Sequence, residues 1–175
     1  ITVSEDFATK VPESMKSEYA APLFCAGITA YKAVKAAEPK KNKKVAIFGI
    51  GGVGHMAIQF AKIEGCEVSG ISRKEKHLDV AKKLGADNVF AYSSDQERFL
   101  SELIENYGLF DAAIVFAPVD EVTDTAIKSV KKGGTVVIAT VGKIPNFLAF
   151  EEKTVRRSEE RRVGKECRSR WAPYH

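Results

Sequence analysis

The sequence predicts an α/β fold with a doubly wound parallel sheet, and three observations support this prediction. From residue 44 onward, short apolar runs alternate with stretches of helical periodicity, which is typical of strands covered by helices on both faces. Two of the helical stretches are followed by glycine after a basic last turn, a common helix stop signal. The chain has 175 residues, of which 45% are hydrophobic and 29% are charged, enough for one globular domain with a core.

The first element is a helical stretch over residues 15–37, which we expect to be interrupted near Pro22 and to end before Pro39. Five strands follow, over residues 45–49, 67–71, 88–91, 112–116 and 135–141. Between them the periodicity predicts four helices, over residues 53–64, 74–84, 95–106 and 121–132. Strand–helix–strand connections are nearly always right-handed, so this series winds into an open sheet.

The four helices are recognised by their faces and their ends. Residues 53–64 are apolar on most sides, as in a helix wedged between a sheet and a neighbour. The next two helices each carry an apolar stripe at helical spacing. We expect the helix over residues 74–84 to stop at Gly85, and the helix over residues 121–132 to stop at Gly133 and Gly134.

The net charge of +4 is concentrated at the end of the chain. Residues 156–175 hold seven of the 27 Lys and Arg but three of the 23 Asp and Glu, so residues 1–155 carry 20 of each. This segment resembles a read-through peptide of cloning or sequencing origin, and we expect it to be disordered. The alternative for an Arg-rich arm with one Trp is nucleic-acid binding through phosphates and stacking. For the chain as a whole we expect no specific nucleic-acid partner.

The cysteines and the N-terminus bear on the compartment. Cys25, Cys66 and Cys167 lie far apart and form no C-x-x-C pair, and an odd count argues against a disulfide framework. No apolar run is long enough to span a bilayer, and the N-terminus has no secretory signal, so no membrane partner is expected. These features favour a reducing cytoplasm.

A glycine-rich turn predicts the ligand. The run Gly49-Ile50-Gly51-Gly52-Val53-Gly54 satisfies G-x-G-x-x-G between a predicted strand and a predicted helix, as a Rossmann-type dinucleotide site requires. Gly49 allows the tight turn, Gly51 lets the backbone approach a pyrophosphate, and Gly54 allows close packing of helix on strand. The first N–H groups of the helix, including that of Val53, then face the phosphates. The alternative is a glycine-rich turn that binds nothing.

The end of the second predicted strand indicates which dinucleotide is bound. NAD sites normally have an acidic residue here for the ribose hydroxyls, but this chain has Ser72, Arg73 and Lys74. A hydroxyl with two cations suits a 2′-phosphate, which Arg grips through charge-assisted hydrogen bonds. We therefore predict NADP(H) over NAD(H). The alternative is that Arg73 and Lys74 simply begin an exposed helix.

Two motifs carry a resemblance to a known family. The segment over residues 20–31, AAPLFCAGITAY, followed by residues 49–62, resembles the medium-chain zinc-dependent alcohol dehydrogenases. Within them it is most similar to the NADP-dependent cinnamyl-alcohol-dehydrogenase-like branch. In that family the Cys of the first motif is a ligand of the catalytic zinc, and the resemblance gives this role to Cys25. It places Thr29 beside the nicotinamide.

Other interpretations remain open for these residues. Without the resemblance, a single Cys in an apolar helix is more typical of a small buried hydrophobic residue than of a ligand. Zinc needs about three protein ligands in a catalytic site, and this chain offers one suitable thiolate. His55 is expected on the cofactor side of its helix, and His77 on an exposed helix face.

The resemblance covers residues 1 to about 155 and implies three parts. Residues 1–38 would be the end of the catalytic (zinc) domain with its linking helix, residues 39–155 the NADP-binding Rossmann domain, and residues 156–175 a tail outside the family. Because the family's sixth strand is not recognised, we expect a sheet that is incomplete at its last strand. The family's other zinc ligands are not found either, so this piece alone is expected to be inactive.

In the family, zinc polarises an alcohol or carbonyl oxygen while hydride passes to or from the nicotinamide. The resemblance therefore implies a fragment of an NADP-dependent, zinc-dependent alcohol dehydrogenase that interconverts a primary alcohol and an aldehyde. It also implies a small-molecule alcohol or aldehyde as the partner and a homodimer in the full-length parent. Two alternatives stay open, a cofactor-binding module without activity of its own and a zinc-free relative of the quinone-reductase type.

Overall fold

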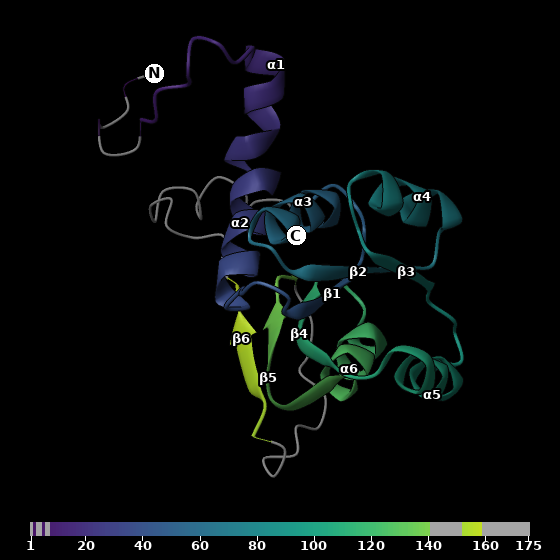
Figure 1. The fold of residues 1–175 in the computed structure, drawn as a ribbon. Coiled ribbons are helices and arrows are strands. Elements are labelled where there is room, and N and C mark those ends of the chain that lie inside the picture. Colours follow the sequence, from purple (N-terminus) through teal and green to yellow (C-terminus); the bar gives the residue numbers. More distant parts are fainter. Residues whose placement is uncertain (1, 3–4, 6–7, 141–151, 159–175) are drawn as a thin grey trace, which may run out of the picture.

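The computed structural model describes residues 2, 5, 8–140 and 152–158. Its centre is a parallel sheet of six strands in the order β3-β2-β1-β4-β5-β6 (Figure 1). The strands are β1 (Lys44–Phe48), β2 (Glu67–Ser72), β3 (Asn88–Ala91), β4 (Phe110–Val115), β5 (Val130–Ile138) and β6 (Thr154–Arg157). This order is that of a doubly wound sheet, so the predicted fold class is confirmed.

Helices cover both faces of the sheet (Figure 1). Along β1, Val45 and Ile47 point into one core and Ala46 and Phe48 into the other, as the alternation of a strand requires. The first core is completed by α2 (Ala26–Ala36), α3 (Gly54–Ile63) and α4 (Glu75–Lys83). The second is completed by α5 (Gln96–Tyr107) and α6 (Asp120–Lys128). Because both faces are covered, the central strands β1 and β4 are buried along most of their length.

The predicted helical stretch upstream of the sheet is interrupted where Pro22 lies. It is divided into α1 (Ser17–Ala20), the 3-10 helix η2 (Ala21–Phe24) and α2. Pro22 lies in the first turn of η2, where its missing N–H costs no hydrogen bond. In the described part of the chain, no helix is long and apolar enough to cross a membrane.

The glycine pair Gly133–Gly134 is not the helix stop that the sequence predicts. Helix α6 ends at Lys128, and β5 begins at Val130 and includes both glycines. The register between β4 and β5 shifts here, and Gly133 has a φ of 71°. A Cβ on Gly134 would lie 2.8 Å from the carbonyl oxygen of Asp111. The prediction is wrong because glycine pairs serve β-bulges as well as helix ends.

The expectation of a sheet without its sixth strand is also wrong. Residues Thr154–Arg157 pair in parallel with β5, with Val155 opposite Val136. Val155 packs against the second core, and this contact stabilises the pairing of β6 with the edge of β5. Arg156 donates a 3.1 Å hydrogen bond to the carbonyl oxygen of Ala36 at the end of α2 and pairs with Glu38. The prediction that the basic tail over residues 156–175 is disordered is wrong for Arg156 and Arg157, which belong to β6. Residues 159–175 of this tail lie outside the described residues.

Candidate dinucleotide-binding site

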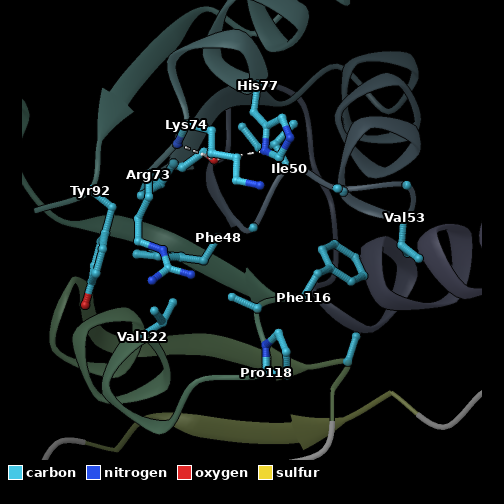
Figure 2. A pocket seen from close by; sticks show the side chains of 18 of the residues that line it. Phe48, Ile50, Val53, Arg73, Lys74, His77, Tyr92, Phe116, Pro118 and Val122 are labelled. Carbon is cyan, nitrogen blue, oxygen red and sulfur yellow. Dashed lines mark hydrogen bonds between the residues drawn. The ribbon is translucent and has the colours of Figure 1, made fainter. Parts of the chain in front are cut away.

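A pocket of about 370 Å³ opens at the carboxyl ends of β1, β2 and β4 (Figure 2). Strand β1 has β2 on one side and β4 on the other, so the chain winds away from it in both directions. Open α/β sheets bind ligands at such a switch point. The pocket is lined by every residue that the sequence predicts for cofactor binding: Thr29, Gly49, Gly51, Gly52, Val53, Gly54, Ser72, Arg73 and Lys74.

The glycine turn between β1 and α3 leaves the backbone bare toward the pocket. Gly49 has a φ of +91°, and a Cβ on it would lie 2.8 Å from the backbone nitrogen of Ala117. A Cβ on Gly54 would lie 2.1 Å from the carbonyl oxygen of Gly49, so the start of α3 fits against the turn only with glycine. A Cβ on Gly51 or Gly52 would meet nothing within 4 Å. This open cradle at a helix N-terminus, where backbone N–H groups lack helical partners, fits a pyrophosphate.

The end of β2 makes one side of the pocket electropositive. Ser72 is buried, and its hydroxyl lies 3.4 Å from the backbone nitrogen of Lys74. Arg73 and Lys74 are exposed, and neither has an ion-pair partner among the described residues. No Asp or Glu belongs to the described residues that line the pocket. Two cations without a carboxylate therefore face the space in which a ligand would lie.

His77 belongs to this side of the pocket and not to an exposed helix face. It is half-buried in the first turn of α4 and lines the pocket near Lys74 and Ile50 (Figure 2). Its Nδ1 atom lies 3.3 Å from the hydroxyl of Ser72. The predicted exposure is wrong because the first turn of α4 folds back over the end of β2. The position of His77 in the first turn of a helix that directly follows the end of β2 could have indicated this.

The remaining wall of the pocket is mostly apolar, and the sequence analysis did not identify it. It is formed by Phe48, Ile50, Ile71, Tyr92, Phe116, Ala117, Pro118, Val122 and Ala139 (Figure 2). The hydroxyl of Tyr92 lies 3.1 Å from that of Thr125, which holds the tyrosine ring toward α6. Apolar walls with a few polar groups are typical of cofactor sites. The available signal was that all of these residues except Val122 lie at or near the carboxyl ends of predicted strands.

Thr29 and Cys25 lie one helical turn apart at the start of α2. Thr29 is buried, and its hydroxyl donates a 2.8 Å hydrogen bond to the carbonyl oxygen of Cys25. Thr29 lines the pocket from α2. Cys25 is exposed and is not among the residues that line the pocket. The alternative interpretation of Cys25 as a buried hydrophobic residue is therefore wrong.

The described residues do not supply a zinc site. A catalytic zinc takes about three protein ligands, commonly from Cys, His and carboxylates. No group of three such side chains lies within reach of one metal ion in the part of the chain that the structure describes. Cys25 is thus a single exposed thiol without a partner ligand among these residues.

Residues 52–166 match the zinc-binding dehydrogenase family, which is more than half of the chain. An alcohol dehydrogenase of Geobacillus stearothermophilus is 39% identical over 133 residues, which are 76% of this chain and 39% of the relative. The probable formaldehyde dehydrogenase AdhA of Bacillus subtilis is 35% identical over 159 residues, or 90% of this chain and 44% of the relative. The chain thus spans less than half the length of these relatives.

Solved structures share the fold. The alcohol dehydrogenase of the archaeon Aeropyrum pernix is 31% identical with a TM-score of 0.74, and the match covers 86% of this chain and 46% of that chain. The acetophenone reductase of Geotrichum candidum, solved in complex with NAD, is 27% identical with a TM-score of 0.72. That match covers 86% of this chain and 43% of the reductase.

Proposed function

We propose, from the premise that this chain belongs to the zinc-binding dehydrogenase family, that it is the cofactor-binding part of an NADP-dependent alcohol dehydrogenase. The whole enzyme would interconvert a small primary alcohol and an aldehyde. The relatives named an alcohol dehydrogenase and a probable formaldehyde dehydrogenase support this reaction class. The motifs over residues 20–31 and 49–62 support the cinnamyl-alcohol-dehydrogenase-like branch within the proposal.

The preference for NADP rests on one observation: Arg73 and Lys74 line the pocket and no carboxylate does so among the described residues. An NAD site typically places an acidic side chain at the end of the second strand to bind the ribose hydroxyls, and such a charge repels a 2′-phosphate. Here the buried Ser72 occupies that strand end. A hydroxyl and two cations offer hydrogen-bond donors to a phosphate and no repulsion.

Different residues of the pocket would bind different parts of the cofactor. The N–H groups of the glycine turn and the first turn of α3 would hold the pyrophosphate, and Ser72 with Arg73 would hold the 2′-phosphate. Thr29 would lie beside the nicotinamide. When bound, the nicotinamide supplies the carbon that accepts or donates hydride. The apolar wall around Phe116 and Pro118 would exclude water from that end of the pocket.

Cys25 and the edge of the sheet are the two features that would connect this chain to the rest of the enzyme. Cys25 would be one zinc ligand of a longer protein, with its other ligands outside the described residues. The outer edge of β6 is the candidate surface for a homodimer. The cytoplasm remains the proposed compartment.

Titration of the purified chain with NADPH and with NADH, followed by nicotinamide fluorescence, tests the proposal. We expect NADPH to bind at least about 10-fold more tightly, because charge-assisted bonds to a phosphate contribute about 1.5–3 kcal/mol each. Arg73→Ala should lose most of this advantage while NADH binding stays unchanged. Lys76→Ala is the matched control, because Lys76 is exposed on α4 and does not line the pocket.

Each outcome of this titration has a separate meaning. Equal affinity for NADPH and NADH would contradict the NADP preference but leave the dinucleotide site intact. If neither cofactor binds, the proposed site itself is wrong. Equal losses for NADPH in Arg73→Ala and Lys76→Ala would show that the contribution is long-range charge and not a contact made by Arg73.

A further inference from the structure

His77 is joined to the proposed phosphate subsite by a short chain of polar contacts. Its Nδ1 atom lies 3.3 Å from the hydroxyl oxygen of Ser72, and the same oxygen lies 3.4 Å from the backbone nitrogen of Lys74 (Figure 2). Ser72 is 8% exposed and also lines the pocket. The imidazole ring is half-buried and faces the pocket. A ligand phosphate next to Ser72 would therefore lie within reach of this ring.

The hydrogens of this chain of contacts depend on the charge of the ring. The Ser72 oxygen accepts from the N–H of Lys74, and with a neutral ring that carries its hydrogen on Nε2 the hydroxyl donates its own hydrogen to Nδ1 of His77. With a protonated ring, Nδ1–H donates to Ser72 instead, and the serine hydrogen is released toward the pocket. Protonation of His77 therefore adds a positive charge and also frees a second donor for a ligand oxygen.

The ionisable groups that line the pocket with His77 are cations, so an anionic group such as a phosphate is the ligand that suits this side of the pocket. Helix α4 packs on β2, β3 and α3. The ionisable side chains of these elements, of the loop before α4 and of α4 itself are Glu67, His55, Lys62, Arg73, Lys74, Glu75, Lys76, Asp79, Lys82 and Lys83. Glu67 accepts from Tyr107 at the far end of β2, and Lys62 pairs with Asp87. Of these residues, only Arg73 and Lys74 line the pocket with His77.

From this geometry we infer that His77 is a further specificity-determining residue: in its protonated form it contacts the 2′-phosphate of the bound dinucleotide and strengthens the preference for NADP(H) over NAD(H). The inference rests on the proposed function, because it needs the 2′-phosphate to lie at Ser72 and Arg73. The sign follows from linkage, since the protonated ring binds the phosphate more tightly and phosphate binding takes up a proton. The preference should therefore rise as the pH falls, because protonation of the imidazole adds a charge that attracts the 2′-phosphate.

The ratio of the dissociation constants of NADH and NADPH isolates the contribution of the 2′-phosphate, because contacts common to both cofactors cancel. We would measure this ratio from pH 8 to pH 6 for the unmodified chain, His77→Gln and His77→Lys. The phosphate itself gains a proton near pH 6, but this affects all three proteins alike. The difference between the unmodified chain and His77→Gln therefore reports His77.

At pH 6 we expect His77→Gln to lower the ratio about 10-fold, and at pH 8 by less than about 2-fold, in line with one charge-assisted hydrogen bond at a half-exposed site. His77→Lys should keep its advantage over His77→Gln at both pH values, because the charge of lysine does not titrate in this range. His55→Gln is the matched control. His55 bonds to the carbonyl oxygen of Gly51 and does not line the pocket, so its replacement should leave the ratio unchanged.

Three results would overturn the inference. One is a ratio for His77→Gln that follows the unmodified chain at every pH. Another is an equal loss of NADPH and NADH affinity in His77→Gln, which would mean that His77 only supports the local fold. A third is an effect of His55→Gln as large as that of His77→Gln. If the unmodified chain shows no preference for NADPH at any pH, the proposed NADP specificity fails, and the inference fails with it.

Discussion

The two ends of the parallel sheet are built for different purposes. At the carboxyl ends of the strands, bare glycines surround a pocket together with Arg73 and Lys74, which have no ion-pair partner in the described part of the chain. At the amino ends, carboxylates are held by cations and backbone N–H groups. Asp111, for example, accepts a 2.7 Å hydrogen bond from the N–H of Lys44 and pairs with Lys131.

The amino end repeats this pattern between neighbouring strands. Asp87, just before β3, accepts from Lys62 at 2.8 Å and from the N–H of Val68 in β2 at 2.6 Å. Tyr107 donates a 2.8 Å hydrogen bond to Glu67, and burial is the main reason that its pKa is raised to about 12. These contacts connect strand starts to one another and to helix ends. The difference teaches that charges satisfied within the chain stabilise the fold, whereas charges left without partners remain available to a ligand.

We expect the largest loss of stability from a substitution at the binding end, because Gly54 lies there but is needed for the packing of α3 on the glycine turn. In Gly54→Ala the new Cβ would lie 2.1 Å from the carbonyl oxygen of Gly49, which is backbone and cannot move away cheaply. We expect the free energy of unfolding to fall by about 3 kcal/mol, as for other strongly overpacked sites. Urea denaturation followed by circular dichroism would measure this.

Gly51→Ala is the matched control for Gly54→Ala. A Cβ at Gly51 meets nothing within 4 Å, so stability should change by less than about 0.5 kcal/mol. The methyl group would instead occupy the space proposed for the pyrophosphate and weaken the binding of NADPH and NADH alike. Equal stability losses in the two variants would mean that the clash at Gly54 relaxes. They would contradict the assignment of Gly54 to packing and of Gly51 to cofactor binding.

The second largest loss of stability is expected at the amino end of the sheet. Asp111→Ala removes the acceptor of the Lys44 N–H and the partner of Lys131, so we expect a loss of about 2 kcal/mol in the free energy of unfolding. The affinity for NADPH should stay unchanged, because Asp111 lies at the opposite end of the sheet from the pocket. A stable Asp111→Ala protein with weakened NADPH binding would contradict the division of roles.

The sequence predicted more of the binding end than of the amino end. The glycine turn and the run Ser72–Lys74 are local patterns whose chemistry is visible within a few residues, and the structure brings them to one pocket. The contact of Asp111 with Lys44 joins residues that are 67 positions apart. No periodicity reports such a pair, because it depends on the strand order and on the register between β1 and β4.

The errors have similar physical causes. His77 lies on a polar helix face by periodicity, but the start of α4 folds over the end of β2, which tertiary packing decides. Gly133 and Gly134 fit a helix stop and a β-bulge equally well until the strand is paired. Strand β6 was missed because its four residues include two arginines, and its pairing depends on the edge that β5 offers.

The smallest expected effect is the response to acid. Burial raises the pKa of Asp87 and of Asp111, but hydrogen bonds from Lys62 and Val68, and from Lys131 and Lys44, outweigh it and lower both pKa values. A carboxyl with a lowered pKa contributes stability above its unfolded pKa, near 3.9, which is lost as the pH falls through the folded value.

We therefore expect the free energy of unfolding to fall by about 1 kcal/mol between pH 5 and pH 3 through these two groups, because both are partly exposed and screened by solvent. Urea titrations at several pH values would measure the slope. The double variant Asp87→Asn/Asp111→Asn should show a flatter pH dependence over this range. An unchanged slope in that variant would assign the acid response to other carboxylates.

On this account, the pocket at the carboxyl end of the sheet binds a 2′-phosphorylated dinucleotide, whereas the contacts at the amino end stabilise the fold. A nitrogen-15 NMR titration with adenosine 2′,5′-bisphosphate, and separately with 5′-AMP, tests it most directly. We predict that the bisphosphate shifts the amide signals of residues 49–54 and 72–77, that 5′-AMP shifts residues 72–77 much less, and that the amides of Lys44, Val68 and Phe110 stay in place. Equal shifts at residues 72–77 with both ligands, or shifts concentrated at the amino end, would contradict it.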